Sequence, residues 1–300
     1  MKIAYVDRRF MGPALDVVDQ ANDIIDEYVG QGYDLTLRQL FYQFVARALL
    51  PNTERSYKRL QSIVSDARMA GLIDWGVIKD RTRTLRSLPH WDGPREIMSS
   101  VVSQFRIDKW ARQEVALEVW IEKQALVGVI DGVCDQHQVP YFACRGYVSQ
   151  SFMHEAAERM ARRVQAGRAP IVLHLGDHDP SGIDMTRDIE ERLSLFVDGP
   201  VEVRRLALNM DQVRLHGPPP NPAKLSDVRA GVDRQGNVTP GSYVDLHGYE
   251  SWELDSLPPQ VISDLVGQEI EGLRDDGLWD DALEEEESGR AKLATAMANM

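Results

Sequence analysis

Three carboxylates follow two apolar runs of the chain, where strands of one sheet are expected to end. The first run, Val115–Ile121, is closed by Glu122. The second run, Ala169–Leu175, is followed by Asp177 and Asp179. Ligand sites of parallel sheets form at the carboxyl edge of the strands. Carboxylates that meet there repel one another unless a cation joins them, and oxygen ligands suit magnesium or manganese. The pattern predicts a divalent-metal site for phosphate chemistry.

Each of these acidic residues also has a purely structural interpretation. Glu122 is a suitable charge for the N-terminus of a helix, where the helix dipole stabilises it. Asp177 and Asp179 precede Pro180, and this order is typical of a turn that caps a helix. The two apolar runs favour the functional interpretation, because they place all three carboxylates at one edge of one sheet.

Composition narrows the class of protein. The 300 residues are 43% hydrophobic, enough for a sizeable core. The two cysteines, Cys134 and Cys144, cannot form a disulfide framework or a four-cysteine zinc site. Residues 1–9 carry charge and lack an apolar core, so they do not resemble a signal peptide, and no apolar run has the length that spans a bilayer. We therefore expect a cytoplasmic protein without a membrane partner.

The net charge of −13 argues against nucleic acid, but the charge is unevenly distributed. Residues 36–112 contain 14 Lys and Arg and only 7 Asp and Glu, while acidic residues cluster after residue 274. A basic segment in an acidic chain is typical of a surface that binds phosphate backbone, although a solvated helical surface has the same composition. The residues predicted to bind nucleic acid are Arg38, Lys58, Arg59, Arg81 and Arg83.

The first third of the chain reads as helical. Helices are expected at 12–28, 37–50, 54–70 and 94–111, with a short extended pair at 72–78. This order of a helix, a turn, a second helix and a small extended unit is typical of a winged helix-turn-helix. Small helical bundles have a similar sequence pattern. We predict a winged-helix-like DNA-binding domain over residues 1–112.

From residue 115 the pattern changes to alternating strands and helices. Strands are expected at 115–121, 139–144, 170–175 and 201–208, separated by helices at 124–136, 151–165 and 182–196. This alternation predicts an α/β domain with a parallel sheet over residues 113–300. Its C-terminal extension is expected to contain a Pro- and Gly-rich loop at 216–242, a strand at 251–257 and a helix at 259–273. The acidic tail from residue 284 is expected to be frayed or disordered.

Two motifs resemble a known family. Residues 120–123 (Trp-Ile-Glu-Lys) and 176–182 (Gly-Asp-His-Asp-Pro-Ser-Gly) are similar to the Toprim fold of topoisomerases, primases and related nucleases. They most resemble the A subunit of topoisomerase VI and the meiotic double-strand-break proteins. Those proteins carry Arg-x-x-hydrophobic-Tyr on a winged-helix segment, and residues 38–42 (Arg-Gln-Leu-Phe-Tyr) match it. The resemblance covers about residues 35–210.

The resemblance implies a set of roles. Tyr42 would attack a DNA phosphodiester while Arg38 clamps the phosphate. The carboxylates of Glu122, Asp177 and Asp179 would hold Mg²⁺ or Mn²⁺. In the family the tyrosine and the metal site meet across a homodimer, so a homodimer is expected. Nothing in the chain reads as an ATP-binding domain, which leaves a separate ATPase subunit as a further expected partner.

Helix geometry gives an independent view of Tyr42. One apolar stripe of the expected helix must face the core, and it consists of Leu37, Leu40, Phe41, Phe44 and Val45. Tyr42 lies off this stripe, and Arg38, four residues earlier, falls on its side of the helix. This predicts an exposed tyrosine beside an arginine. The alternative is a tyrosine packed against a neighbouring element with its hydroxyl hydrogen-bonded.

Three functions remain open from the sequence. The first is a magnesium-dependent, topoisomerase-like transesterase that uses Tyr42. The second is a Toprim nuclease that uses water, and the third is a non-catalytic DNA-binding module. Glu253 and Asp255 are further candidates for carboxylates in the outer shell of the site.

Overall fold

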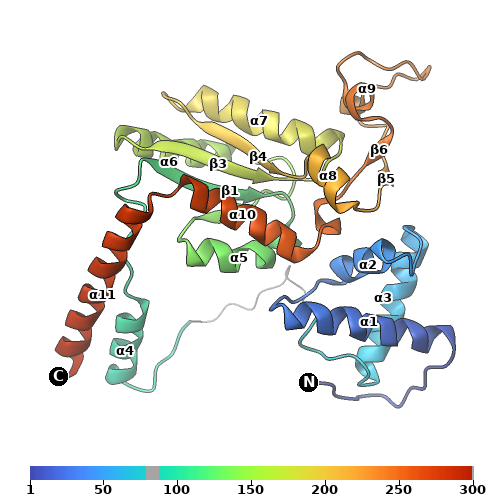
Figure 1. Ribbon diagram of the computed structural model, residues 1–300, viewed down its shortest axis with the longest axis horizontal. Coiled ribbons are helices and arrows are strands. Elements are labelled where there is room, and N and C mark those ends of the chain that lie inside the picture. Colours follow the sequence, from blue (N-terminus) through green and yellow to red (C-terminus); the bar gives the residue numbers. More distant parts are fainter. Residues whose placement is uncertain (79–87, 299–300) are drawn as a thin grey trace.

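The computed structural model describes residues 1–78 and 88–298 (Figure 1). Arg81 and Arg83, two of the predicted DNA-binding residues, lie outside the described residues. Within the described ranges the chain combines a helical N-terminal region with a four-stranded parallel sheet covered by helices. The α/β class predicted from the sequence is therefore confirmed. No helix in these ranges has the length and apolar character that a membrane span needs.

Three helices form the N-terminal region: α1 (Pro13–Gly30), α2 (Leu37–Ala46) and α3 (Glu54–Met69). A capping box starts α2, because Thr36 and Gln39 satisfy each other's backbone N–H groups. The three helices share one core, which includes Val18, Ile24, Leu40, Phe44 and Leu60. The predicted extended pair at 72–78 is wrong for these residues, since they form only an isolated bridge between Ile78 and Leu35.

The sheet has the order β2-β1-β3-β4, and all neighbours are parallel. Its strands are β1 (Val115–Ile121), β2 (Tyr141–Ala143), β3 (Ala169–Leu175) and β4 (Glu202–Ala207). Apolar residues fill β1 and β3 because both faces of the sheet are covered. The helices α5 (Val127–Gln136) and α10 (Pro259–Leu273) pack on one face, and α6 (Gln150–Gln165) and α7 (Pro180–Phe196) on the other (Figure 1).

The segment between β4 and α10 consists of short elements. They are α8 (Met210–His216), β5 (Asn221–Pro222), the 3₁₀ turn η2 (Val228–Ala230), α9 (Tyr243–His247), β6 (Glu250–Ser251) and the 3₁₀ turn η3 (Leu254–Ser256). The expected strand at 251–257 is therefore a two-residue strand followed by a turn. This segment runs beside the start of α7, because Trp252 pairs with His178 through two backbone hydrogen bonds of 2.8 and 2.9 Å.

The acidic tail is an ordered helix, and the prediction of a frayed end from residue 284 is wrong. The helix α11 (Asp276–Ala298) lies alongside α4 (Pro94–Gln104) (Figure 1). Within it Glu286 is buried and pairs with the buried ammonium group of Lys109 at 2.8 Å. Composition alone did not reveal this partner, which lies far away in the sequence.

Candidate functional site

The ends of β1 and β3 place two of the predicted carboxylates side by side. Residue Ile121 of β1 is in register with Leu175 of β3, and Glu122 N–H donates to the Leu175 carbonyl at 2.8 Å. The Oε2 atom of Glu122 accepts a hydrogen bond of 2.8 Å from the backbone N–H of Asp177. Glu122 and Asp177 therefore meet at the carboxyl edge of the sheet, as the sequence predicts.

Gly176 makes this close approach possible. A Cβ atom at position 176 would lie 3.0 Å from Glu122 Oε2 and 3.2 Å from Cε1 of His174. Both contacts are tighter than ordinary packing allows. The glycine thus lets the Glu122 carboxylate lie against the backbone that carries Asp177.

Asp179 caps the helix α7. Its Oδ1 atom accepts hydrogen bonds from Gly182 N–H at 2.6 Å and from the Ser181 hydroxyl at 3.0 Å. Pro180 follows at the first helical position, which suits its fixed φ. A Cβ atom at Gly182 would lie 2.1 Å from the carbonyl oxygen of Asp177. The motif Asp-x-Asp-Pro-x-Gly therefore forms a tight turn. Asp179 caps the helix, and Gly182 leaves room for the Asp177 carbonyl oxygen.

Asp177 is buried and holds two fixed partners. Its Oδ1 atom accepts from Leu254 N–H at 2.7 Å, and its Oδ2 atom lies 2.9 Å from the Lys123 ammonium group. Burial raises the pKa of Asp177 to about 7, against the opposing charge of Lys123. Burial also raises the pKa of Glu122. These groups keep their protons more readily than exposed carboxylic acids, as buried carboxylic acids do both in functional sites and in structural ion-pair networks.

Lys123 is the cation of the site, and the residue-by-residue reasoning from sequence did not identify it. Its Nζ atom lies 2.9 Å from Asp177, 3.0 Å from Glu253 and 3.1 Å from Asp255. Burial would lower the pKa of Lys123, but the three carboxylates raise it well above its usual value. The only sequence signal for this residue is its place directly after Glu122 in the motif at 120–123.

Glu253 and Asp255 complete the acidic cluster. They were expected only as more distant carboxylates of the site, and the structure brings both within reach of Lys123 through the turn η3. Burial would raise the pKa of Glu253, but the charges of Lys123 and Arg38 lower it to about 2. Burial raises the pKa of Asp255, the more deeply buried of the two.

Arg38 and Tyr42 approach this cluster from the helix α2. The Arg38 Nη2 atom lies 2.8 and 3.0 Å from the two Glu253 oxygens and 3.1 Å from the Tyr42 hydroxyl. The predicted pairing of Arg38 with Tyr42 is confirmed, and it is linked to the carboxylate site.

The predicted exposure of Tyr42 is wrong. Only 1% of the residue is accessible, because α2 packs against η3 and the turn covers the side of the helix that the apolar stripe leaves free. Burial first, and then the charges of Asp255 and Glu253, raise the pKa of Tyr42. The alternative interpretation, a packed tyrosine with a bonded hydroxyl, describes this arrangement.

Arg205 supports the turn from β4 and was also missed. Its Nη2 atom donates to the carbonyls of Gly176 and Asp177 at 3.1 and 2.6 Å, and its Nη1 atom donates to Gly182 at 2.8 Å. Burial lowers the pKa of Arg205 to about 10. The guanidinium group fixes the backbone that carries the two aspartates, and no short motif marks it in the sequence.

The arrangement does not fit a bound magnesium ion as it stands. Carboxylate oxygens are the right donors, but Asp179 caps α7 and Asp177 is held by Lys123 and Leu254. Within residues 1–78 and 88–298, no three His, Cys, Asp or Glu side chains form a metal-ligand set. Lys123 provides the positive charge that a metal was expected to provide.

Two of the predicted DNA-binding residues lie on the helix α3. Both Lys58 and Arg59 are exposed, and Lys58 forms an ion pair with Glu54 one turn earlier at 2.7 Å. They therefore belong to the solvent face of α3 and not to the carboxylate cluster.

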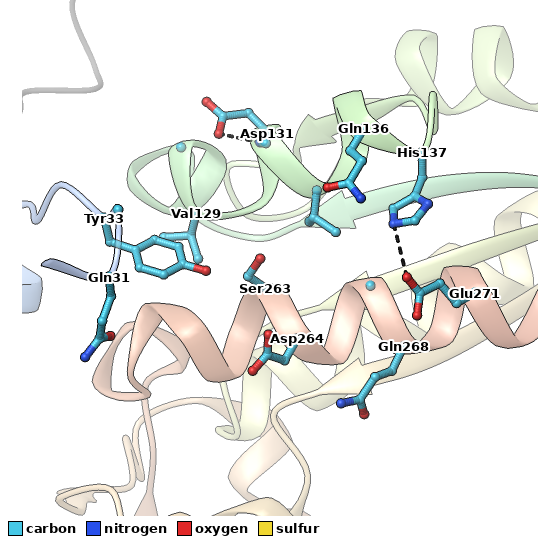
Figure 2. A pocket seen from close by; sticks show the side chains of 15 residues that line it. Gln31, Tyr33, Val129, Asp131, Gln136, His137, Ser263, Asp264, Gln268 and Glu271 are labelled. Carbon is cyan, nitrogen blue, oxygen red and sulfur yellow. Dashed lines mark hydrogen bonds and ion pairs between the residues drawn. The ribbon is translucent and has the colours of Figure 1, made fainter. Parts of the chain in front are cut away.

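A separate groove of about 460 Å³ lies between the turn after α1 and the helices α5 and α10 (Figure 2). Gln31 and Tyr33 line one end, Asp264 lies on α10, and His137 faces Glu271 at 3.7 Å at the other end. None of the predicted site residues that the structure describes lines this groove, so it is distinct from the carboxylate site.

Comparison with models of protein families finds no match to this chain, and no curated protein matches its sequence.

Proposed function

We propose that this chain is a magnesium-dependent DNA-binding and strand-cleaving protein of the topoisomerase VI A type, with a winged-helix-like N-terminal domain and a Toprim domain. The observation that carries the proposal is the link between Tyr42 and the carboxylates. Arg38 contacts both the Tyr42 hydroxyl and Glu253, and Lys123 joins Glu253 to Asp177. A tyrosine hydroxyl, a guanidinium group and an acidic cluster thus lie together, which supports the proposed roles of nucleophile and phosphate clamp.

In the proposed reaction the Tyr42 oxygen attacks a DNA phosphorus atom. The new Tyr42–phosphorus bond forms as the phosphorus–oxygen bond to the leaving sugar oxygen breaks. The Tyr42 hydroxyl loses one proton and the sugar oxygen gains one, through the solvent, so the transfer is balanced. A DNA phosphate would replace Glu253 as the anionic partner of Arg38, since guanidinium groups bind both kinds of anion. Glu253, with its low pKa, is a weak proton acceptor, so its proposed role is to hold Arg38 in position before DNA binds.

Mg²⁺, or Mn²⁺, is the proposed cofactor, with oxygen ligands from Glu122, Asp177 and Asp179. Its charge would neutralise phosphate in the cleavage reaction. Because Lys123 pairs with Asp177 and Asp179 caps α7, binding of the ion requires both contacts to change.

The proposed substrate is duplex DNA, bound through the basic segment 36–112. Exposed residues such as Lys58 and Arg59 would contact backbone phosphates, which makes the affinity strongly dependent on salt. A homodimer and a separate ATPase subunit remain proposals that follow from the resemblance. A cytoplasmic location is a proposal that follows from the composition.

The burial of Tyr42 favours a second candidate function. A tyrosine that is 1% exposed and has a raised pKa is a poor nucleophile until the contact between α2 and η3 opens. A Toprim nuclease that activates water would not need this opening. A third candidate is a non-catalytic DNA-binding module. It is favoured by the ion pairs of Lys123, which stabilise the carboxylates without a metal ion.

The deciding experiment uses labelled supercoiled and linear DNA with Mg²⁺ or Mn²⁺, followed by denaturation and a gel for protein-linked DNA. We expect an adduct from the native chain and its loss in Tyr42→Phe. Tyr57→Phe is the matched control, because the Tyr57 ring also packs against Arg38, with a centroid distance of 5.3 Å, and should keep the adduct.

The other outcomes separate the alternatives. Cleavage without an adduct, unchanged in Tyr42→Phe, would replace the transesterase by the hydrolytic nuclease. DNA binding without cleavage, unchanged by Glu122→Gln or by a chelator, would support the non-catalytic module.

A further inference from the structure

A cavity of about 180 Å³ lies at the amino ends of the strands, at the opposite end of the sheet from the carboxylate cluster. Its lining includes Leu117 near the start of β1, Pro140 just before β2 and Arg168 just before β3. Arg163, from the last turn of α6, also lines it. None of the predicted site residues that the structure describes reaches this cavity, so it is a separate feature of the fold.

The buried carboxylate nearest to Arg163 already has other partners. Glu118 is buried on β1, and its Oε2 atom accepts from Trp120 Nε1 at 3.0 Å and from Arg159 Nη2 at 3.1 Å. Arg159 Nε reaches the other oxygen, Oε1, at 3.3 Å. Arg163 lies 3.6 Å from Oε1, which is beyond hydrogen-bond distance. Glu118 is therefore occupied by Arg159 and neutralises Arg163 only in part.

The charge of Arg168 is also incompletely balanced. Its Nη1 atom donates to the Trp110 carbonyl at 3.2 Å and lies 3.9 Å from a carboxylate oxygen of Asp108. The Asp108 side chain is 63% exposed, so water and salt screen its charge. The side chains of Arg163 and Arg168 are only 22% and 20% exposed. Two largely buried guanidinium groups thus line one cavity, and neither has a close carboxylate of its own.

The cluster carries an excess of positive charge. Among the described residues that act on Arg163, three guanidinium groups meet two carboxylates, and one of these is the exposed Asp108. Burial lowers the pKa of Arg163, and the charges of Arg168 and Arg159 add to this effect against the attraction of Glu118. Arginine nevertheless keeps its charge in proteins. A bound anion that offers acceptor oxygens to both guanidinium groups would therefore stabilise the cluster.

We propose that this cavity binds a phosphate group through Arg163 and Arg168. A phosphate monoester carries about −1.5 to −2 charges at pH 7, which balances the excess, and its oxygens match the paired N–H groups of guanidinium. The cavity has space for about six water molecules, which admits one phosphate group and excludes a DNA duplex. The site does not depend on the proposed DNA cleavage, because it lies at the other end of the sheet.

A neighbouring groove sets the size of the ligand. This groove of about 610 Å³ shares Gln138 and Pro140 with the cavity, and its lining includes Arg106 and Tyr141. It gives room for the remainder of a small phosphate monoester, such as a mononucleotide, whose phosphate lies in the cavity. Free phosphate and a monoester have the phosphate group in common, and the experiment distinguishes them.

Equilibrium dialysis with labelled inorganic phosphate, in a chloride buffer free of sulfate, tests the site. We expect saturable binding to the native chain, weakened by about tenfold or more in Arg163→Gln and in Arg168→Gln. Arg162→Gln is the matched control, because Arg162 is exposed on the same turn of α6 and should bind phosphate like the native chain. No saturable binding to the native chain, or equal binding by all the variants, would overturn the proposal.

Two further measurements separate loss of the site from loss of the fold. Bound phosphate stabilises a folded chain, so phosphate should raise the melting temperature of the native chain and of Arg162→Gln but not of Arg163→Gln. Asp108→Asn removes a competing charge, and its amide oxygen can still accept from Trp110 N–H. This variant should therefore bind phosphate more tightly than the native chain, and weaker binding would contradict the proposed site.

Competition between labelled phosphate and a 5′-mononucleotide identifies the source of the phosphate group. A nucleotide that competes more strongly than unlabelled phosphate would assign the cavity and its neighbouring groove to a monoester. A nucleotide that does not displace bound phosphate would assign the cavity to the free ion.

Discussion

The ammonium group of Lys123 lies 2.9 Å from Oδ2 of Asp177, at the carboxyl edge of the central strands. This contact puts a protein cation where a metal ion was expected. It joins residues from β1, β3 and the C-terminal extension, because Lys123 also contacts Glu253 and Asp255. Three carboxylates at this edge therefore share one ammonium group.

Replacing that lysine by a residue of similar length tests its role. Lys123→Met leaves three carboxylates without their shared cation, and we expect the free energy of unfolding to fall by about 3–5 kcal/mol at pH 8. The loss should be smaller at pH 5, because Asp177, with its pKa near 7, is protonated there. Denaturant unfolding at both pH values measures this. Lys58→Met, at an exposed pair on α3, should not move the unfolding midpoint. Equal losses at pH 5 and pH 8 would show that the charge of Asp177 does not contribute to the effect of Lys123→Met.

Asp177 should make the protein less stable as the pH rises. Burial raises the pKa of Asp177 to about 7, so the folded chain holds a proton that the unfolded chain releases. Its contribution to stability is present below the unfolded pKa near 4 and is lost as the pH rises towards 7. In Asp177→Asn the amide oxygen can still accept from Leu254 N–H, so we expect a higher melting temperature than native at pH 8 and a flatter profile between pH 4 and 8.

A second aspartate gives a control of opposite sign. Asp184 has a lowered pKa, because hydrogen bonds from Tyr147, Arg187 and Arg229 outweigh its burial. Its contribution to stability is present above the unfolded pKa and is lost as the pH falls. Asp184→Asn should therefore lower the melting temperature at pH 8. If Asp177→Asn did the same, the raised pKa of Asp177 would not be the cause of the pH dependence.

Gly182 should not tolerate even one methyl group. A Cβ atom there would lie 2.1 Å from the Asp177 carbonyl oxygen, so Gly182→Ala must displace the turn that carries both aspartates. We expect a loss of about 3 kcal/mol or more, measured by denaturant unfolding. Gly272→Ala is the matched control in α10, where the new methyl group meets no atom within 4 Å and should stabilise by up to about 1 kcal/mol. A neutral Gly182→Ala variant would show that the turn can shift freely.

The ordered acidic tail depends on a buried ion pair. Glu286 and Lys109 have side-chain exposures of only 7% and 6%, so Glu286→Ala leaves a buried ammonium group without its partner. We expect a loss of about 3–5 kcal/mol and faster proteolysis within α11. Glu285→Ala removes an exposed pair with Arg112 and should change stability by less than about 1 kcal/mol. Similar effects of the two changes would argue against docking through Glu286.

Local patterns in the sequence predicted most of the regular structure. The runs 115–121, 169–175 and 259–273 match β1, β3 and α10, because continuous apolar runs and helical periodicity reflect burial on the sheet and on its helices. The same patterns predicted that Glu122 and Asp177 meet, since parallel strands that end together place their following residues at one edge.

Tertiary structure alone decided what surrounds those residues. Tyr42 was expected on an exposed face, and it is buried because η3, more than 200 residues later, packs on it. Lys123, Arg205 and the two late carboxylates join the site through contacts between distant segments, which no local periodicity records. The acidic tail is a helix for the same reason, since Glu286 has its partner at Lys109. The chain's own sequence determines which strands end in carboxylates, and the folded packing determines which charges those carboxylates meet.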